Sequence, residues 1–406
     1  MTESPMTTRQ LNGRVALFTS TRLVLTSVVR MVYPFLAIFA SNLHVDISRI
    51  SLAIAFSFIA SAAAPFLAPI ADRRGRKTGM LLGISIVLTG TFLAGLIPSY
   101  STLFLVIMLG NLGNNLYLPA MQAYVGDHVP YQKRGLYLAI TELSWALSFV
   151  LIIPLAGWII EVSNWYTPFI LVGILGLVMM FLLWRNLPAD HPEEPPAGNL
   201  FSDFKRIFTY APAILGLAFG VAICAANEVV NVVFGVWIQT SYGVEIAALG
   251  AATLLIGLSE VTGEGLTAYL ADHLGKKRSV ALGLVLNAAV CLSLPFFSRS
   301  LTGAFIWLFL FYMTFELAII SSLPLMTEVY PQARATMMAL LIAAFSLGRA
   351  LGDLISPGLF KHGINFNGMA AVGFNMLALV MLSLVHLPAE EAARQAEQVP
   401  TDHNQL

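Results

Sequence analysis

A charged loop that occurs twice, two hundred residues apart, constrains this chain more than any other feature. Residues 72–77 read Asp-Arg-Arg-Gly-Arg-Lys and lie between two apolar runs. Residues 272–278 read Asp-His-Leu-Gly-Lys-Lys-Arg, again between apolar runs, and align with the first copy without a gap. Arg134 and Arg334 align at the same offset. A repeat of this length, with its charged loops in register, predicts two similar halves.

The composition predicts a protein that crosses a lipid bilayer several times. Hydrophobic residues make up 57% of the chain and charged residues 11%, and the mean hydropathy is +0.78. A soluble domain carries roughly 25% charged residues. The net charge of zero argues against a nucleic-acid partner. Cys224 and Cys291 lie within apolar runs, so we expect packing residues and no disulfide.

Twelve apolar segments are near the roughly 20 residues that a bilayer requires. They form two groups of six, one in each half of the repeat. The expected spans are 15–40, 47–71, 78–97, 101–124, 135–160, 165–184, 211–237, 246–271, 279–297, 301–326, 335–360 and 367–387.

These spans divide the chain into four parts. We expect an N-terminal six-helix bundle at 1–184, a cytoplasmic Pro-rich linker at 185–209, a C-terminal six-helix bundle at 210–387 and a polar cytoplasmic tail at 388–406. The first dozen residues are polar, so no removable signal peptide is expected.

The positive charges predict the orientation. Most of the Lys and Arg residues, including the groups at 73–77, 133–134, 205–206 and 276–278, fall in loops on one side of the membrane. Cytoplasmic loops carry the excess of positive charge. Both termini are therefore expected in the cytoplasm.

Twelve spans in two groups of six, a Pro-rich linker and the 72–77 motif resemble the major facilitator superfamily over essentially the whole chain. Ala68 and Ala268 stand where that family has a Gly before each motif. The resemblance implies an all-α membrane protein of 12 transmembrane helices, with two pseudo-symmetric six-helix bundles around a central cavity. It also implies a monomer of the bacterial inner membrane that opens alternately to either side.

The resemblance further implies a cytoplasmic latch between the halves, built on the repeated loop. A carboxylate at a helix C-terminus needs a cation nearby, and a Gly permits a tight turn. The alternative is that the cations only set the topology. The residues assigned to the latch are Asp72, Gly75, Arg76, Asp127, Asp272, Gly275 and Lys276.

The resemblance to drug–proton exchangers is weaker. That group carries an Arg in the fourth span, whereas this chain has Asn111, Asn114 and Asn115 there and no Arg. The Gly-Pro motif of the fifth span is only partly matched at 153–158. The chain is closer to the broad group of bacterial efflux-permease-like members.

Ionisable residues within the spans predict a polar cavity, because each costs about 2.5–3.5 kcal/mol at membrane depth unless it is paired or hydrated. Arg22 and Glu142 lie at similar depth, roughly 10 Å from the cytoplasmic side, and are expected to pair. Glu228 has two candidate cations, Arg30 across the cavity and Arg349 in its own half. Either Glu228 alternates between them as a switch, or it forms a permanent structural pair with Arg349.

Carboxyl groups and amides complete the predicted site. Glu260 and Glu316 lie within spans eight and ten, where a carboxyl group can take up and release a proton, as coupling requires. The predicted substrate and proton-coupling residues are Arg30, Tyr33, Asn111, Asn114, Glu142, Asn227, Glu228, Asn231, Glu260, Glu316 and Arg349.

The sequence carries no signature of an enzyme. It has no Gly-rich phosphate loop, no metal-ligand spacing among its His residues and no hydrolase triad motif. We expect no cofactor and no metal, with a proton gradient as the energy source. The predicted function is secondary transport of a small organic solute, with export in exchange for protons as the first expectation. Proton-coupled uptake, a lipid flippase of the same fold and a non-transporting sensor are the alternatives.

Overall fold

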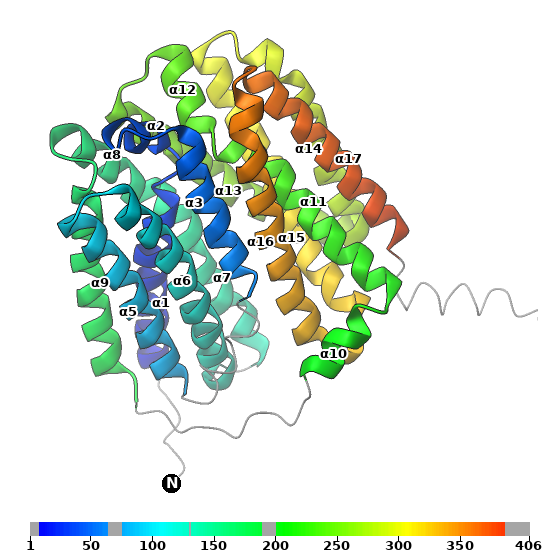
Figure 1. Cartoon of the computed structure of the whole chain (residues 1–406). Helices are drawn as coiled ribbons and strands as arrows, with labels where there is room; N and C mark the ends of the chain where they lie inside the picture. The colour runs from blue at the N-terminus through cyan, green and yellow to red at the C-terminus, as the bar shows by residue number, and fades with distance from the viewer. Residues whose placement is uncertain (1–7, 64–74, 130, 189–199, 386–406) are drawn as a thin grey trace, which may run out of the picture.

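The computed structural model describes residues 8–63, 75–129, 131–188 and 200–385, and nearly all of them are helical (Figure 1). The first half contains α1 (Thr8–Arg30), α2 (Leu36–Asn42), α3 (Ile47–Ser61), α5 (Arg76–Leu96), α6 (Tyr100–His128), α7 (Tyr131–Leu147), the π-helix η1 (Ser148–Ile152), α8 (Ile153–Val162) and α9 (Thr167–Asn186). The second half contains α10 (Leu200–Ile207), α11 (Ala211–Asn231), α12 (Phe234–Tyr242), α13 (Ile246–Leu274), α14 (Lys276–Phe297), α15 (Leu301–Val329), the 3-10 turn η2 (Pro331–Ala333), α16 (Arg334–Phe360) and α17 (Ile364–Leu384).

Most predicted spans coincide with helices long and apolar enough to cross a membrane. Within the described ranges there are 10 such helices, or 11 if α2 and α3, bent by 118°, count as one span. The predicted span 15–40 is instead divided into α1, a series of turns and α2. The predicted span 47–71 begins as α3, and its last residues lie outside the described part of the chain. Within the predicted linker, Leu200–Ile207 forms the short helix α10.

Each half contains a helix break at the same place in the repeat. In the first half, residues 31–35 form turns around Pro34, which has no N–H to continue the helix. In the second half, α12 follows α11 after a two-residue break without a Pro. The carbonyl of Val229 beside this break accepts hydrogen bonds from Ser356 Oγ (2.6 Å) and Asn367 Nδ2 (2.8 Å). Side chains of α16 and α17 thus satisfy a backbone group at the break.

The upper end of the molecule in Figure 1, where α2, α8 and α12 lie, closes by backbone contact between the halves. A Cβ atom added to Gly235 would lie 2.7 Å from the Cα of Pro34 and closer still to its carbonyl oxygen. A Cβ atom added to Gly157 would lie 3.1 Å from the Cα of Gly250. Only glycine allows backbones to approach this closely.

Two hydrogen bonds also join the halves near this end. The Glu161 carboxylate accepts the backbone N–H of Ala247 in the first turn of α13 at 2.7 Å, where helix N–H groups have no partner in the helix. The hydroxyl of Thr253 donates to the carbonyl of Phe149 in η1 at 3.0 Å. A π-helix disturbs the regular backbone pattern, and η1 is one of the elements, with α7 and α8, on which α13 packs.

The repeated loops start helices in the same way at the lower end of Figure 1. Gly75 (φ +95°) precedes α5 and Gly275 (φ +81°) precedes α14, and both need the positive φ that glycine allows. The Lys77 ammonium donates to the carbonyl of Leu187, beyond α9, at 2.8 Å. At the equivalent place Lys277 donates to the carbonyl of Val385, beyond α17, at 2.7 Å. In each half, the loop is therefore tied to the end of that half's last helix.

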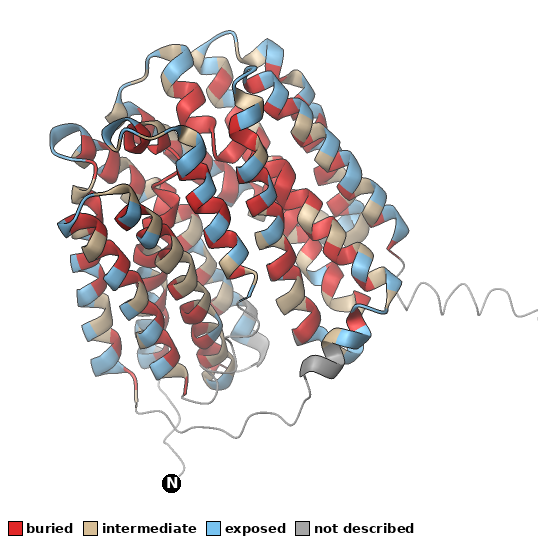
Figure 2. Ribbon diagram, in the orientation of Figure 1, coloured by how far each residue is buried: buried red, intermediate tan, exposed pale blue. Residues whose placement is uncertain are grey.

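Many helix positions that face away from the centre are exposed, pale blue in Figure 2, and many of the exposed side chains are large and apolar. Large exposed side chains lie there on many helices, as expected where lipid is the solvent. Among them are Leu151, Trp158, Phe181, Trp184, Leu292 and Phe296. The prediction of an all-α membrane protein is confirmed.

The backbone contact at the upper end predicts the effect of one methyl group. In Gly235→Ala the new Cβ atom would meet backbone atoms of Pro34, which cannot rotate away, so the halves must separate locally. We expect faster amide hydrogen exchange in α2 and α12 than in the wild type. Gly373→Ala is the control, since a Cβ atom added there would meet nothing within 4 Å. Wild-type exchange rates in Gly235→Ala would contradict the assignment of this contact as the seal.

Candidate functional site

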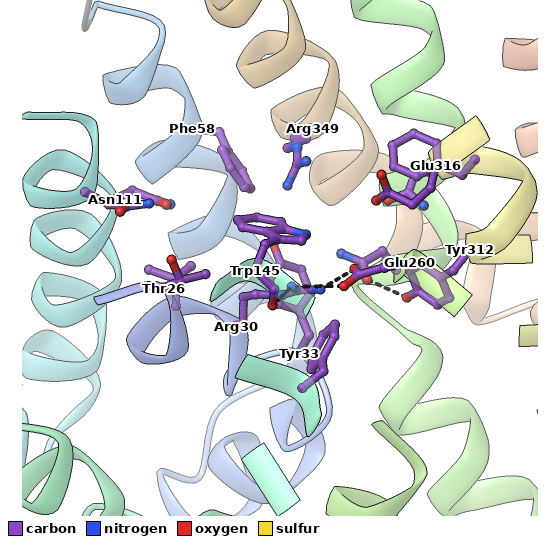
Figure 3. Close-up of a pocket in the computed structure, with 16 residues that line it drawn as sticks. Thr26, Arg30, Tyr33, Phe58, Asn111, Trp145, Glu260, Tyr312, Glu316 and Arg349 are labelled. Carbon is purple, nitrogen blue, oxygen red and sulfur yellow. Dashed lines mark hydrogen bonds and ion pairs between the residues drawn. The ribbon is translucent and has the colours of Figure 1, made fainter. Parts of the chain in front are cut away.

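A cavity lies at the centre of the molecule between the two halves (Figure 3). It encloses about 600 Å³ of empty space, its opening included. Helices of both halves contribute to its wall, and the break after α1 contributes one residue. The lining residues are Thr26, Val29, Arg30, Tyr33, Phe58, Asn111, Asn114, Trp145, Phe149, Asn227, Asn231, Glu260, Tyr312, Phe315, Glu316 and Arg349.

The structure places nearly all of the predicted site residues on this cavity. The exceptions are Glu142 and Glu228, which are not among the lining residues. The prediction missed the aromatic wall, formed mainly by Phe58, Trp145 and Phe149. Trp145 and Phe149 lie one helical turn apart, a spacing that sequence alone cannot distinguish from ordinary packing.

Arg30 and Glu260 form a buried ion pair between the halves. Arg30 is the last residue of α1 and Glu260 lies in the middle of α13, and their side chains are only 7% and 3% exposed. Both guanidinium Nη atoms donate to the carboxylate of Glu260, with Nη1 to Oε2 at 3.2 Å. Nη1 also donates to the carbonyl of Trp145 at 2.6 Å. The guanidinium carbon lies 4.2 Å from the ring centroid of Trp145 and 3.6 Å from that of Phe149.

The predicted partner of Arg30 was wrong, because Glu260 and not Glu228 reaches it in this structure. Glu228 is fully buried and turned toward α16, where Gly352 leaves room for its side chain. Its Oε1 accepts from Asn231 Nδ2 at 3.0 Å, and Asn231 Oδ1 accepts from Tyr312 at 2.6 Å. Its Oε2 has no hydrogen-bond partner among the described residues. Neither Arg30 nor Arg349 lies within 4.0 Å of it.

A second fully buried carboxyl group lies near Glu228. Asp353 is 0% exposed, and both of its oxygens are without a hydrogen-bond partner in the part of the chain that the structure describes. Its electrostatic neighbours are Glu228 and Arg349. The sequence prediction did not place Asp353 in the site.

Arg349 enters the cavity from α16 without a carboxylate partner. Within the described residues, no carboxylate oxygen lies within 4.0 Å of its guanidinium nitrogens. Its guanidinium carbon lies 5.5 Å from the ring centroid of Phe58 and 5.7 Å from that of Trp145. Figure 3 shows its guanidinium group pointing toward Trp145, with Phe58 beside it. Arg349 therefore has donors to offer to a ligand.

Other polar groups of the cavity are also only partly satisfied. Asn111 donates to Ser57 at 2.6 Å, whereas Asn114 Oδ1 and Asn227 Nδ2 find no partner among the described residues. Glu316, on α15, has no cation within 4.0 Å in the same set. Unsatisfied buried groups around an empty space are the usual sign of a place for water or ligand.

The predicted pair of Arg22 and Glu142 is confirmed, but it lies outside the cavity wall. Arg22 Nη2 donates to Glu142 Oε2 at 2.7 Å, and Arg22 Nη1 to the carbonyl of Thr141 at 3.1 Å. Gln122 donates to the second oxygen of Glu142 at 3.4 Å. Glu264, one turn beyond Glu260 on α13, is half-buried and lies in the electrostatic field of this pair.

The latch residues form contacts within each half. Arg76 Nε donates to Asp127 Oδ2 at 3.3 Å, which joins α5 to α6. Lys276 pairs with Glu328 in the same way and joins α14 to α15. In this conformation each of these partners belongs to the adjacent antiparallel helix of the same half, and the bridge between the halves that was predicted for Arg76, Asp127 and Lys276 stays a prediction. Asp72 lies outside the described residues, as does the side chain of Asp272 near the end of α13.

The cavity shows no metal-binding arrangement. No group of three or more His, Cys, Asp or Glu side chains that could hold a metal ion occurs among the described residues.

Comparison with known proteins gives a consistent family. The family model described as Major Facilitator Superfamily matches residues 19–352 and 217–403. The chain is 26% identical over 402 residues, 95% of its length and 98% of the relative's, to the uncharacterized MFS-type transporter YceJ of Bacillus subtilis (strain 168). It is 23% identical to Multidrug resistance protein 2 of the same organism, covering 88% of this chain and 91% of that one. It is 22% identical to the citrate-proton symporter of Salmonella typhi, with coverages of 79% and 82%.

Solved structures share the fold. The crystal structure of a D-xylose-proton symporter matches 92% of this chain and 98% of its own, with a TM-score of 0.74 and 16% identity. A bacterial homologue of the human lysosomal transporter Spinster, in an inward-facing and occupied conformation, matches 94% of this chain and 97% of its own, with a TM-score of 0.72 and 16% identity. The predicted all-α membrane fold is thereby confirmed, with 10 or 11 of the 12 predicted spans found among the described residues.

Removing the charge of Glu260 tests the ion pair. Glu260→Gln keeps the shape of the side chain but leaves the Arg30 cation buried without a carboxylate, a change that costs about 3–5 kcal/mol in buried pairs. We expect a clearly lower melting temperature of the purified protein in detergent. Glu245→Gln is the control, because Glu245 is exposed at the start of α13 and makes no capping hydrogen bond. Equal melting temperatures for the two variants would show that breaking the Arg30–Glu260 pair does not destabilise the protein.

Proposed function

The chain belongs to the Major Facilitator Superfamily, and we propose that it is a secondary transporter that carries a small organic solute across a membrane by alternating access, coupled to protons. The observation that carries the proposal is the central cavity between the halves, with Arg349 and Glu316 lining it unpaired among the described residues. Solute sites at the interface of two related halves are typical of secondary transporters. One chain encloses the cavity, which supports a monomer as the working unit.

The closed upper end supports a state that opens toward the lower end. The Gly235–Pro34 and Gly157–Gly250 contacts block the upper side, and the Arg30–Glu260 pair holds α1 against α13 below them. The lower end carries the repeated loops with their Lys and Arg residues. The excess of positive charge supports a cytoplasmic lower end in a bacterial inner membrane. In this assignment the structure represents the conformation closed to the outside.

Proton coupling is supported by the carboxyl groups that lack a cation. An ionised carboxylate in a water-poor site needs a cation or several hydrogen bonds, and without them the neutral form is favoured. Glu316 faces the cavity, and Glu228 and Asp353 lie behind its wall. None of the three has a cation within 4.0 Å among the described residues. Each can therefore hold a proton in one state and release it in another.

The alternating step needs a second contact between α1 and α13 that replaces the Arg30–Glu260 pair when the upper end opens. Arg22 lies about 12 Å below Arg30 along α1, and Glu264 about 6 Å below Glu260 along α13. Glu264 has no hydrogen-bond or ion-pair partner among the described residues. We propose that closing the lower end brings Glu264 to Arg22, so that two ion pairs between the same helices alternate. Each pair stabilises one state, as a two-state carrier requires.

The charges near Arg349 favour co-transport of solute and proton. Arg349 is an electrostatic neighbour of Glu228, although it lies more than 4.0 Å away. If an acidic group of the solute neutralises Arg349, no cation remains near the buried carboxyl group of Glu228, and the solute is best accommodated together with a proton. Solute and proton then bind together and move in the same direction. The similarity to a citrate-proton symporter agrees with movement of solute and proton in the same direction.

Export in exchange for protons, the first expectation from sequence, is the second candidate. The aromatic side chains of the cavity and the similarity to Multidrug resistance protein 2 favour it. Exchange requires that solute and proton exclude each other from the site, which a cationic or apolar solute at Glu316 would satisfy. The direction in which a pH gradient drives the solute separates the two candidates.

A pH gradient across proteoliposomes tests the coupling. The solute is first selected by thermal stabilisation of the purified protein across a panel of metabolites and drugs. We expect uptake to accelerate when the outside is made acidic and to slow when an ionophore collapses the gradient. Glu228→Gln should lose this pH response while still exchanging labelled for unlabelled solute. Flux that ignores the gradient would disprove proton coupling.

The alternating pair gives a separate expectation. Glu264→Gln should leave the melting temperature unchanged, because Glu264 has no partner among the described residues in this conformation, but it should slow transport several-fold. Glu264→Asp keeps the charge and should recover part of the rate. A normal transport rate in Glu264→Gln would exclude the proposed ion pair between Glu264 and Arg22.

A further inference from the structure

The cation that faces the cavity is the starting point for the chemistry of the solute. Arg30 already has a carboxylate partner, since both of its Nη atoms donate to Glu260 and Nη1 also donates to the Trp145 carbonyl. Arg349 has no carboxylate within 4.0 Å among the described residues. A guanidinium group offers a planar fork of donors that matches a carboxylate. The available cation of the cavity therefore suits an acidic solute.

The surroundings of Arg349 are aromatic. Phe58 and Trp145 lie beside its guanidinium group, with ring centroids at 5.5 and 5.7 Å from the guanidinium carbon (Figure 3). Phe149, Tyr312 and Phe315 continue the wall. Trp145 is only half-buried, so part of its ring is available to a ligand. Aromatic rings pack on one another by offset or edge contacts, and a flat ring would meet such faces here.

The acidic residues of the cavity limit the charge of the solute. Glu260 and Glu316 line the same space as Arg349. A second negative charge on the solute would lie near these carboxyl groups without a cation of its own, since Arg30 is already occupied.

We propose that the solute is a small aromatic monocarboxylate, with its carboxylate on Arg349 and its ring against Trp145 and Phe58. This proposal rests on the proposed transport function and names the class of solute for the same cavity. The carboxylate replaces water as the partner of a cation at membrane depth. The ring fills the aromatic wall, and both features are needed for tight binding.

Binding in detergent tests the proposal without a gradient. Calorimetric titration would compare phenylacetate with phenylacetamide, which lacks the charge, and with cyclohexylacetate, which lacks the aromatic ring. We expect phenylacetate to bind at least about tenfold more tightly than phenylacetamide, since a charged hydrogen bond contributes that much or more. It should also bind more tightly than cyclohexylacetate, because contacts between aromatic rings add to the effect of burial alone. An amide that binds as well as the acid would exclude an anion site. A cyclohexyl acid that binds as well would exclude the aromatic requirement.

A zwitterion separates the proposal from its nearest rival. Phenylalanine adds an ammonium group that Glu316 could bind. If phenylalanine binds more tightly than phenylacetate, the site is built for amino acids and the monocarboxylate class is wrong. No heat from any of the four probes would also overturn the proposal. These comparisons use the wild-type protein and so do not depend on the folding of a variant.

A matched pair of variants assigns the anion to Arg349. Arg349→Gln should weaken phenylacetate binding at least about tenfold. Arg299→Gln should leave it unchanged, because Arg299 is exposed outside the cavity, although it also lies beside a ring, 5.8 Å from the centroid of Phe296. Equal losses in both variants would remove Arg349 from the site. If phenylacetate binds but is not transported under a pH gradient, the proposed transport function is refuted. The proposed class of ligand would still stand.

Discussion

The structure depends on one buried ion pair that crosses the two halves. Arg30 and Glu260 come from helices 230 residues apart in the chain, and both side chains are almost fully buried. A buried pair adds little net stability compared with apolar packing, but breaking it is strongly destabilising. The pair therefore constrains the geometry more than it adds to the stability. The halves can meet at the upper end only in the register that brings both charges together. The carbonyl of Trp145 and the rings beside it complete this condition.

The repeat builds the scaffold but not the chemistry. Helix breaks, positive-φ glycines and the Lys contacts to the helix ends recur in both halves. The charged residues at the centre do not recur. Positions two hundred residues from Arg30, Glu260 and Arg349 hold Val230, Ala60 and Phe149. A symmetric frame thus surrounds an asymmetric site, in which one half supplies Arg30 and most of the aromatic rings and the other supplies most of the ionisable groups.

Whether a feature of this arrangement can be predicted from the sequence depends on its physical origin. The spans were predictable because apolar length is a local property, and the Arg22–Glu142 pair because both residues lie at one depth on adjacent helices. The prediction gave Glu228 the wrong partner because depth alone does not show which way a side chain turns. The rotation of α11 against α16, permitted by Gly352, decides that. The aromatic wall was missed since Trp and Phe in apolar segments are equally suited to packing and to lipid contact.

The glycine contacts at the upper end have a consequence for the energy balance of the cell. Gly235 packs directly against the backbone of Pro34, and Gly157 packs against Gly250 with the ring of Phe35 beside both, so little room is left for water at these contacts. Protons cross membranes readily along chains of hydrogen-bonded water, and a narrow gap is enough to start one. If the carrier is coupled to protons as proposed, a seal made of backbone in direct contact keeps protons from leaking through it. Because the contact involves no charged side chain, salt on either side of the membrane does not screen it.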